Sequence, residues 1–255
     1  MPRDRRDFFY KKAKEEGYRS RAAYKLKQIN EKFKIIKKGD TVVDLGAAPG
    51  GWLQVTKELS GGIVVGVDIL AIEEIEGVDL IKGDMRLDKT IEKIREKIKS
   101  DRVDVVICDA APNLSGSWSY DHARSIDLST SALECARKIL KNGGSFAVKV
   151  FQGDMFPDYL NMVRGFFGKV QAFSPEASRK QSAEIYVIGK ELLTDAVKIN
   201  GEYTVKIENL GANGDGIAKI NDFVVFVRDA KKGEELNIRI RFIKPNFAFG
   251  DRIIG

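Results

Sequence analysis

Three charged residues lie inside or next to strongly apolar runs, where burial is expected to be greatest. Asp109 follows the run 105–108, Lys149 lies within 146–151, and Glu184 begins the run 184–188. A lysine inside a buried strand is unfavourable unless a partner accompanies it. We therefore expect Lys149 to be paired and functional; the alternative is a lysine at a strand end whose ammonium group reaches water.

A glycine-rich loop stands at residues 43–52, with the sequence VDLGAAPGGW. A strand should end near Leu45 and a helix should begin near Gly51, so that backbone N–H groups face a ligand. The loop has neither the G-x-G-x-x-G spacing of a dinucleotide site nor the Gly-Lys-Ser/Thr of a phosphate loop. Asp44 within the loop would repel pyrophosphate, but it suits a cofactor that carries an ammonium and a sulfonium group.

Two further acids follow the next apolar runs. Asp68 comes 18 residues after Gly50, where an acid can accept hydrogen bonds from ribose hydroxyls. Asp84 follows a weaker run and could accept the adenine amino group. An isolated surface acid is the alternative for Asp84, but acids at the ends of successive strands favour a shared ligand.

The middle of the chain alternates strand-like and helix-like segments, which predicts βαβ units and a mostly parallel sheet. Such sheets bind ligands at the carboxyl ends of their strands. The expected strands are 41–45, 63–67, 103–108, 145–150 and 184–188, with 78–81 and 170–173 as weaker candidates. The expected helices are 51–59, 89–99, 126–140 and 155–167, with Gly143 and Gly144 turning the chain after the third helix. The segment 109–127, which holds the lone His122, is expected to be a substrate loop.

After about residue 194 the strand-like runs follow one another without a helix between them. They are 203–208, 216–220, 223–227 and 235–242, separated by short glycine- or asparagine-containing turns. Closely spaced strands of this kind predict a small closed barrel.

The charge is concentrated at the N-terminus. Residues 1–39 carry 14 Lys/Arg and 5 Asp/Glu, a net charge of +9, although the whole chain has +6. This asymmetry suggests a polyanionic partner, the alternative being a solvated basic helix. Cys108 and Cys135 match no metal or disulfide spacing, and we expect neither a signal peptide nor a membrane-spanning helix, which together predict a cytoplasmic protein.

At this point the sequence closely resembles the FtsJ/RrmJ (RlmE) family of RNA ribose 2′-O-methyltransferases. The matching strings cover about residues 8–190 and occur in the family's order. They are 20–26, 44–52, 109–113 with 115–116, 148–153, and 178–184, the last being looser than the others.

The resemblance implies a lysine–aspartate–lysine–glutamate tetrad at Lys25, Asp109, Lys149 and Glu184. It also implies contacts with S-adenosylmethionine from the residues Gly50, Trp52, Asp68, Asp84 and Asp109, and no metal. Lys149 would be the general base that removes the proton of the hydroxyl, a role that requires the neutral amine; burial and the second cation Lys25 would favour that form. Asp109 would orient Lys149, while Lys25 and Glu184 would hold the ribose.

The C-terminal part resembles a TRAM domain, a small OB-like barrel found on RNA-modifying enzymes, through the strings 214–219, 223–227 and 232–234. A local RNA face could comprise the cations Arg239, Arg241 and Lys244 and the aromatic residues Phe242, Phe247 and Phe249; the alternative is a structural cap. The basic N-terminal segment offers a second RNA surface with Phe8, Phe9, Tyr10 and Tyr18, unless these rings pack against the sheet.

These observations predict an α/β fold: a Rossmann-like class I methyltransferase with a seven-stranded, mostly parallel sheet, followed by a small OB-like barrel. The expected parts are a basic segment 1–38, a methyltransferase domain 39–192 and a TRAM domain 196–255. The resemblance, which is to the archaeal type, implies methylation of a uridine 2′-hydroxyl in large-subunit (23S) ribosomal RNA by a monomer, within the large ribosomal subunit. A tRNA ribose methyltransferase and a non-catalytic RNA-binding assembly factor remain the alternatives.

Overall fold

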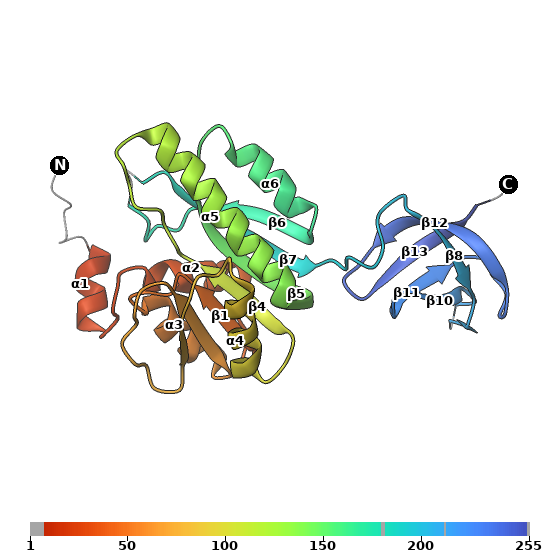
Figure 1. The fold of residues 1–255 in the computed structure, drawn as a ribbon, viewed down its shortest axis with the longest axis horizontal. Helices are drawn as coiled ribbons and strands as arrows, with labels where there is room; N and C mark the ends of the chain where they lie inside the picture. The colour runs from red at the N-terminus through yellow and green to blue at the C-terminus, as the bar shows by residue number, and fades with distance from the viewer. Residues whose placement is uncertain (1–7, 180–181, 212, 254–255) are drawn as a thin grey trace.

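A computed structural model describes residues 8–179, 182–211 and 213–253 of the chain (Figure 1). The start of the predicted basic segment, which includes Arg3, Arg5 and Arg6, therefore lies outside the described residues. Two β-sheets follow one another along the chain, and helices accompany only the first. Within the described part of the chain, no helix is long and apolar enough to cross a membrane.

The first sheet has seven strands in the order β3-β2-β1-β4-β5-β7-β6. Strands β1 to β5 are all parallel to one another, whereas β7 pairs antiparallel with both β5 and β6. The predicted seven-stranded, mostly parallel sheet is thus confirmed. The strands are Val42–Leu45 (β1), Val64–Asp68 (β2), Asp79–Lys82 (β3), Val103–Cys108 (β4), Leu140–Phe151 (β5), Phe167–Phe173 (β6) and Glu184–Leu192 (β7).

Helices cover both faces of this sheet because its strands bury side chains on each side. Alternate residues of β1 show the division: Val43 packs with the helices α4, α5 and α6, whereas Val42 packs with α2 and α3. Helix α1 lies at one end of the molecule and packs against α2 (Figure 1). The helices are Phe8–Glu15 (α1), Ala23–Phe33 (α2), Gly51–Ser60 (α3), Asp88–Ile98 (α4), Trp118–Ile139 (α5) and Phe156–Arg164 (α6).

The expectation of a loop over 109–127 is wrong in its second half, because α5 already begins at Trp118. The first turn of this helix lacks an apolar period, so its sequence resembles a loop. Asp121 fixes it instead: its buried carboxylate accepts hydrogen bonds from the backbone N–H groups of Ser115 and Gly116. His122 is consequently a buried helical residue, and the described loop spans only 109–117.

The second sheet has six strands in the order β8-β12-β13-β11-β10-β9 and curls around its own apolar core. The sequence did not indicate two of these strands, β9 and β13. Strand β9 has only two residues, too few to show an alternation, and β13 contains Gly250 and Asp251, residue types that are rare in strands. The strands are Glu202–Lys206 (β8), Asn209–Leu210 (β9), Gly216–Ile220 (β10), Phe223–Val227 (β11), Glu235–Ile243 (β12) and Phe247–Arg252 (β13).

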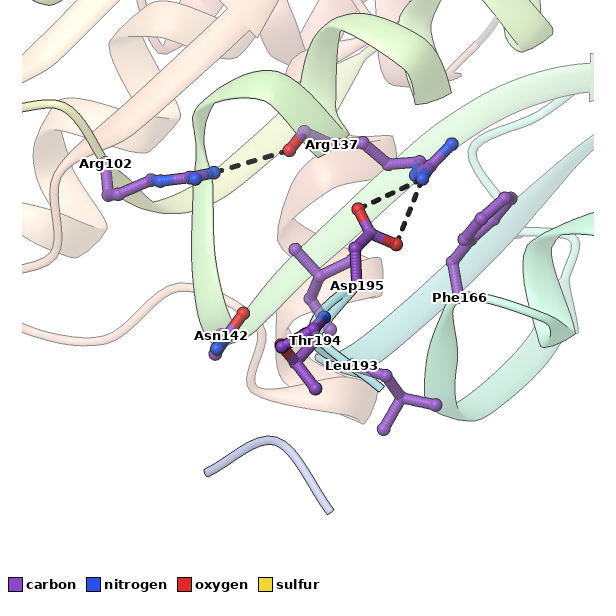
Figure 2. A pocket seen from close by; sticks show the side chains of 9 residues that line it. Arg102, Arg137, Asn142, Phe166, Leu193, Thr194 and Asp195 are labelled. Atoms are coloured by element: carbon purple, nitrogen blue, oxygen red, sulfur yellow. Dashed lines mark hydrogen bonds and ion pairs between the residues drawn. The ribbon is translucent and has the colours of Figure 1, made fainter. Parts of the chain in front are cut away.

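Arg137 of α5 contacts the segment that connects the two sheets (Figure 2). The Arg137 guanidinium lies 3.1 Å from the Asp195 carboxylate and 3.8 Å from the centroid of the Phe166 ring. The Leu193 N–H donates to the Phe166 carbonyl, which ties the connection to the end of α6. These contacts surround a small hollow on the surface, and they fix where the chain leaves β7.

Candidate active site

The strand order reverses between β1 and β4, and ligands of open α/β sheets bind at such a switch point. The glycine loop follows β1 here. Gly46 and Gly50 both have positive φ values, 71° and 111°. A side chain at Gly46 would collide with Ala110, which follows β4, so the two strand ends can approach closely only because residue 46 is a glycine.

Lys149 projects from β5 onto Asp109 at the end of β4. Its Nζ donates a hydrogen bond of 2.6 Å to the backbone carbonyl of Asp109 and lies 3.1 Å from that residue's Oδ1. Lys149 is buried, as the apolar run around it predicted. The amine is therefore held at two points by one residue, which leaves it little freedom to turn away from the site.

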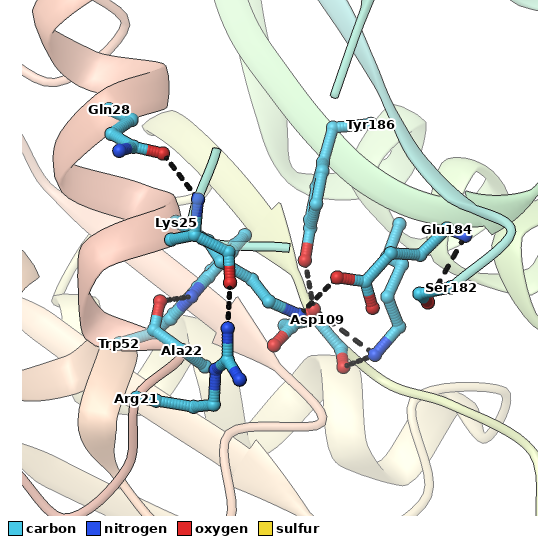
Figure 3. Close-up of polar contacts among 11 residues, drawn as sticks. Arg21, Ala22, Lys25, Gln28, Trp52, Asp109, Ser182, Glu184 and Tyr186 are labelled. Atoms are coloured by element: carbon cyan, nitrogen blue, oxygen red, sulfur yellow. Dashed lines mark hydrogen bonds and ion pairs between the residues drawn. The ribbon is translucent and has the colours of Figure 1, made fainter. Parts of the chain in front are cut away.

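Lys25 and Glu184 form the second pair of the cluster (Figure 3). Lys25 Nζ lies 2.7 Å from Glu184 Oε1, and both side chains are about nine-tenths buried. Glu184 begins β7 and lies opposite Phe151 of β5. Lys149 precedes Phe151 by two residues on β5 and shares its face of the sheet, so Glu184 lies beside Lys149. The structure thus brings together all four residues of the predicted tetrad.

Helix α2 carries Lys25 and is fastened on two sides (Figure 3). The Trp52 indole donates a 2.8 Å hydrogen bond to the Ala22 carbonyl. Across the segment before Glu184, Arg21 donates to the Ala177 carbonyl, and Gln28 accepts from the Ala177 N–H. Trp52, the second residue of α3, is almost fully buried in this packing and links the start of α3 to α2; its contact with the cofactor stays a prediction.

Tyr186 is a functional candidate that the sequence analysis missed. Its hydroxyl donates a 2.7 Å hydrogen bond to Asp109 Oδ1, and its ring packs against Trp52 with centroids 5.8 Å apart. The signal was available, because Tyr186 lies two residues after Glu184 and therefore shares its face of the strand. Burial raises the pKa of Asp109, but Lys149, Lys25 and the Tyr186 hydrogen bond outweigh burial, and the net pKa is lowered. Asp109 is therefore held as a carboxylate.

Asp44 provides the test of whether this site fits S-adenosylmethionine. It is fully buried on β1, and neither carboxylate oxygen has a hydrogen-bond partner within the described chain. Burial, followed by repulsion from Asp109 and Asp68, raises its pKa well above the usual range. A buried acid of this kind is expensive without a partner. A ligand that carries an ammonium and a sulfonium group would provide the missing positive charge, so the residues present fit this cofactor.

The two remaining predicted cofactor acids differ in their surroundings. Asp68 accepts hydrogen bonds from the backbone N–H groups of Ala48 and Leu70, which links the glycine loop to the loop after β2. Asp84 is bound by Arg86, whose guanidinium lies 2.5 Å from it, and this pairing lowers the pKa of Asp84. Asp68 thus lies at the glycine loop, whereas Asp84 would have to share its carboxylate with Arg86.

Arg19, which the sequence placed only among the cations of the basic N-terminal segment, has a role at the glycine loop that was not predicted. Its backbone N–H donates to the Gln54 side chain, and its guanidinium donates to the carbonyls of Pro49, Glu73 and Glu74. It therefore joins the glycine loop to the segment after β2. No local pattern marks such a role, because all three guanidinium acceptors are backbone groups distant in the sequence.

The N-terminal helix α1 divides its aromatic residues between the protein and the solvent. Phe9 packs against Tyr24 of α2, with ring centroids 5.5 Å apart, and Ala13 is buried beside it. Phe8 and Tyr10 are exposed. The predicted arm is therefore partly a packed element, and its exposed rings lie among lysines.

On the outer face of the small sheet, aromatic side chains form a row across neighbouring strands. The ladders place Phe226 of β11 beside Phe249 of β13, and Phe249 opposite Phe242 of β12. The rings of Phe226 and Phe249 are 5.7 Å apart, and Phe247 contacts both. Lys244 lies 4.9 Å from the Phe242 ring. We call Phe226, Phe242, Phe247 and Phe249 the aromatic row; Phe226 was not predicted.

Two of the cations expected on this face are already engaged in ion pairs. Arg239 pairs with Glu202 at 2.5 Å, and Arg241 pairs with Asp251 at 2.8 Å. Exposed pairs of this kind contribute little to stability, so either guanidinium can exchange its partner for a phosphate.

Comparisons with known proteins agree with this geometry. A family profile described as FtsJ-like methyltransferase matches residues 18–192, and a TRAM-domain profile matches residues 196–253. A protein of Methanosarcina mazei, named ribosomal RNA large subunit methyltransferase E, is 63% identical over 251 residues, covering 98% of this chain and 94% of its own. A protein of Halobacterium salinarum with the same name is 45% identical, covering 98% of both chains.

A solved structure supports the same fold for the larger sheet. The crystal structure of a Plasmodium falciparum protein described as a ribosomal RNA methyltransferase superposes with a TM-score of 0.63 at 28% identity. It covers 69% of this chain and 98% of the Plasmodium chain.

The unpaired Asp44 predicts an unusual dependence of stability on pH. The pKa of Asp44 is raised in the folded chain, so the folded chain keeps a proton that the unfolded chain releases above about pH 4. The free energy of unfolding should therefore fall as the pH rises from about 4 toward the raised pKa of Asp44. Replacing Asp44 with asparagine should remove this penalty, worth about 1.4 kcal/mol for each unit of raised pKa. In denaturant titrations of the protein alone, Asp44→Asn should be more stable than wild type at pH 7, and the difference should vanish near pH 4. A constant difference at both pH values would contradict the assignment.

Proposed function

The chain belongs to the FtsJ-like methyltransferase family, and from this membership we propose that it methylates the ribose 2′-hydroxyl of a uridine in large-subunit ribosomal RNA. It is an S-adenosylmethionine-dependent methyltransferase. The observation that carries the proposed chemistry is the buried Lys149 amine, held by two acceptors of Asp109. The relatives from Methanosarcina mazei and Halobacterium salinarum, with matching length, support ribosomal RNA as the substrate.

The geometry of Lys149 suits a general base. A neutral amine has two N–H groups and one lone pair, and the carbonyl and carboxylate of Asp109 account for both N–H groups. The lone pair then remains for the proton of the 2′-hydroxyl. Once Lys149 has taken that proton, the adjacent Asp109 carboxylate stabilises the ammonium.

The other charged residues would position the ribose. Lys25 and Glu184 offer one donor and one acceptor side by side, which matches the paired hydroxyls of a ribose. When bound, S-adenosylmethionine supplies the methyl group, and Gly50 and Asp68 would hold it against the glycine loop, with Asp44 facing its positive charge. Because a hydroxyl is a weak nucleophile, alignment by these residues would supply a large part of the rate enhancement.

The remaining features support an RNA substrate and a single-chain enzyme. All four tetrad residues come from one chain, which favours a monomer. The exposed rings and lysines of α1 and the aromatic row offer stacking and phosphate contacts to RNA. We further propose the division into a basic segment 1–38, a catalytic domain 39–192 and an RNA-binding domain 196–255, acting in the cytoplasm on RNA of the large ribosomal subunit.

The function can be tested with unmethylated transcripts of large-subunit ribosomal RNA and of tRNA. The protein should transfer a radiolabelled methyl group to the ribosomal transcript, and mapping of ribose methylation should place it on a 2′-oxygen of a uridine. Transfer to tRNA alone would reject the proposed substrate. Binding of ribosomal RNA without any transfer would favour an assembly factor.

The general-base assignment predicts that Lys149→Ala loses turnover but keeps its cofactor. The value of kcat should fall about 100- to 10,000-fold, the usual contribution of a general base. Calorimetry should still detect S-adenosylmethionine binding. Lys190→Ala is the matched control, because Lys190 is also a strand lysine that donates to a carbonyl, that of Phe33. Near-normal methylation by the Lys149→Ala variant would reject the assignment.

Asp68 should affect the cofactor before it affects RNA. Asp68→Ala removes a carboxylate that is linked to the glycine loop, so the dissociation constant for S-adenosylmethionine should rise about 10- to 100-fold. The dissociation constant for the ribosomal transcript should change little. Asp79→Ala, which removes an exposed acid at the start of β3, serves as the control. An unchanged cofactor affinity in Asp68→Ala would exclude the proposed contact.

The aromatic row predicts a separate effect on RNA binding. Phe249→Ala and Phe242→Ala should each weaken binding of the ribosomal transcript about 5- to 150-fold, the range expected for loss of one base–aromatic stack. Cofactor affinity should stay constant. Ile199→Ala removes an exposed apolar side chain from the connecting segment and should leave RNA binding intact. If both phenylalanine variants bind RNA as tightly as this control, the small sheet does not act as a stacking surface.

A further inference from the structure

An exposed tryptophan stands beside the tetrad without a role in the mechanism described above. The chain has two tryptophans: Trp52 is 3% exposed at the start of α3, whereas Trp118 is 52% exposed at the start of α5. Exposed apolar side chains that flank a functional centre commonly mark a binding surface. Leu114, Tyr120 and Met155 are also exposed in the neighbouring loops and first helical turn.

Trp118 is held firmly although it is exposed. Its ring is nearly parallel to those of His122 and Phe151, with centroid distances of 5.8 and 6.1 Å. His122 is fixed in turn, because its Nε2 accepts a hydrogen bond from the Met155 N–H. The Asp121 carboxylate anchors the preceding loop through Ser115 and Gly116. The indole is therefore preorganised, and a ligand that contacts it would lose little entropy in ordering it.

The strand ladder places this indole next to the reacting centre. Phe151, on which Trp118 stacks, is the direct cross-strand partner of Glu184. Opposed residues of an antiparallel pair have Cα atoms about 5 Å apart, and their side chains share one face. The loop 109–117 also starts at Asp109 and leads directly to Trp118, the first residue of α5. Trp118 thus belongs to the rim of the tetrad.

The connectivity of a nucleotide limits what can occupy this rim. The base is attached to C1′, the carbon next to C2′, so a 2′-oxygen presented to Lys149 brings its base close to the surrounding loops. From this constraint we propose that Trp118 is a stacking platform for the base of the target nucleotide and holds the ribose in line with Lys149. The proposal rests on the proposed function and adds a residue that contacts the substrate.

The charge beside Trp118 agrees with a nucleotide as the occupant. The Arg124 guanidinium, six residues after Trp118 and one helical turn after Tyr120, lies 5.5 Å from the Tyr120 ring and donates a hydrogen bond to the Asn113 carbonyl. A fixed guanidinium near an exposed indole offers a phosphate contact next to a stacking surface. An apolar protein segment would contact the indole but would bring no anion to this guanidinium.

The two tryptophans allow a direct optical test with the unmethylated large-subunit ribosomal transcript. Adding the transcript to the wild-type protein should quench indole emission, because a base stacked on Trp118 quenches its fluorescence. In Trp118→Phe the remaining emission comes from the enclosed Trp52 and should not change. If saturating transcript leaves wild-type emission unchanged, or if Trp118→Phe is quenched equally, the proposal is wrong.

Kinetics with the same transcript give an independent readout. Trp118→Ala should lower kcat/KM for RNA about 5- to 150-fold, the factor for one lost base stack. Trp118→Phe should retain most of the activity, because a phenyl ring also stacks. Cofactor affinity should be unchanged in both variants. Ile63→Ala removes an exposed apolar side chain just before β2, at the amino ends of the parallel strands and away from the tetrad, and should behave as wild type.

The outcomes separate this proposal from the proposed function. Absence of methyl transfer by the wild-type protein would remove the proposed function and this inference with it. Normal methyl transfer by both wild type and Trp118→Ala would exclude the stacking role of Trp118 and leave the proposed function intact. An effect of Trp118→Ala on assembled subunits but not on the naked transcript would show that Trp118 contacts a protein, and would also overturn the proposal. If the alanine variant unfolds, the fluorescence of Trp118→Phe still decides.

Discussion

The site depends on one electrostatic constraint, a lysine amine placed inside a sheet. Burying Lys149 is tolerable only because Asp109 meets it with both its carbonyl and its carboxylate. Asp109 in turn stays ionised because Lys149, Lys25 and Tyr186 surround it. Strands β4 and β5 must therefore lie side by side with their ends level, which the parallel pairing of Cys108 with Val148 ensures. The charge balance of the site therefore requires this register between β4 and β5.

The glycine loop shows the opposite arrangement, an acid left without a partner. Asp44 lies on the neighbouring strand, and its charge is compensated by no donor among the described residues. Such an acid opposes folding when it ionises, yet it prepares the site for a positively charged ligand. The cluster of Asp44, Asp68 and Asp109 therefore suits a positively charged cofactor, although the repulsion among these acids destabilises the chain without its ligand.

Much of this arrangement was predictable because it depends on local sequence. The apolar runs located most strands of the larger sheet, and the polar residues at their ends located Asp109, Lys149 and Glu184. What could not be predicted depends on register and on distant backbone groups. Phe226 joins the aromatic row only through its ladder with β13, and Arg19 binds carbonyls about 30 and 54 residues away. The early start of α5 depends on Asp121 and the loop before it, so no apolar period announces it.

RNA contacts proposed away from the reacting centre would compensate for the weakness of the nucleophile. A ribose hydroxyl gives the tetrad few groups to hold, and contacts equally strong before and during the reaction do not raise kcat. Exposed rings on α1 and the aromatic row lie on elements that do not belong to the tetrad, so RNA binding there would leave its pairs undisturbed. Binding energy gathered on such remote surfaces can instead keep the hydroxyl aligned with Lys149. The basic N-terminal segment and the second sheet would therefore supply the binding energy that a small, charge-balanced active site cannot supply by itself.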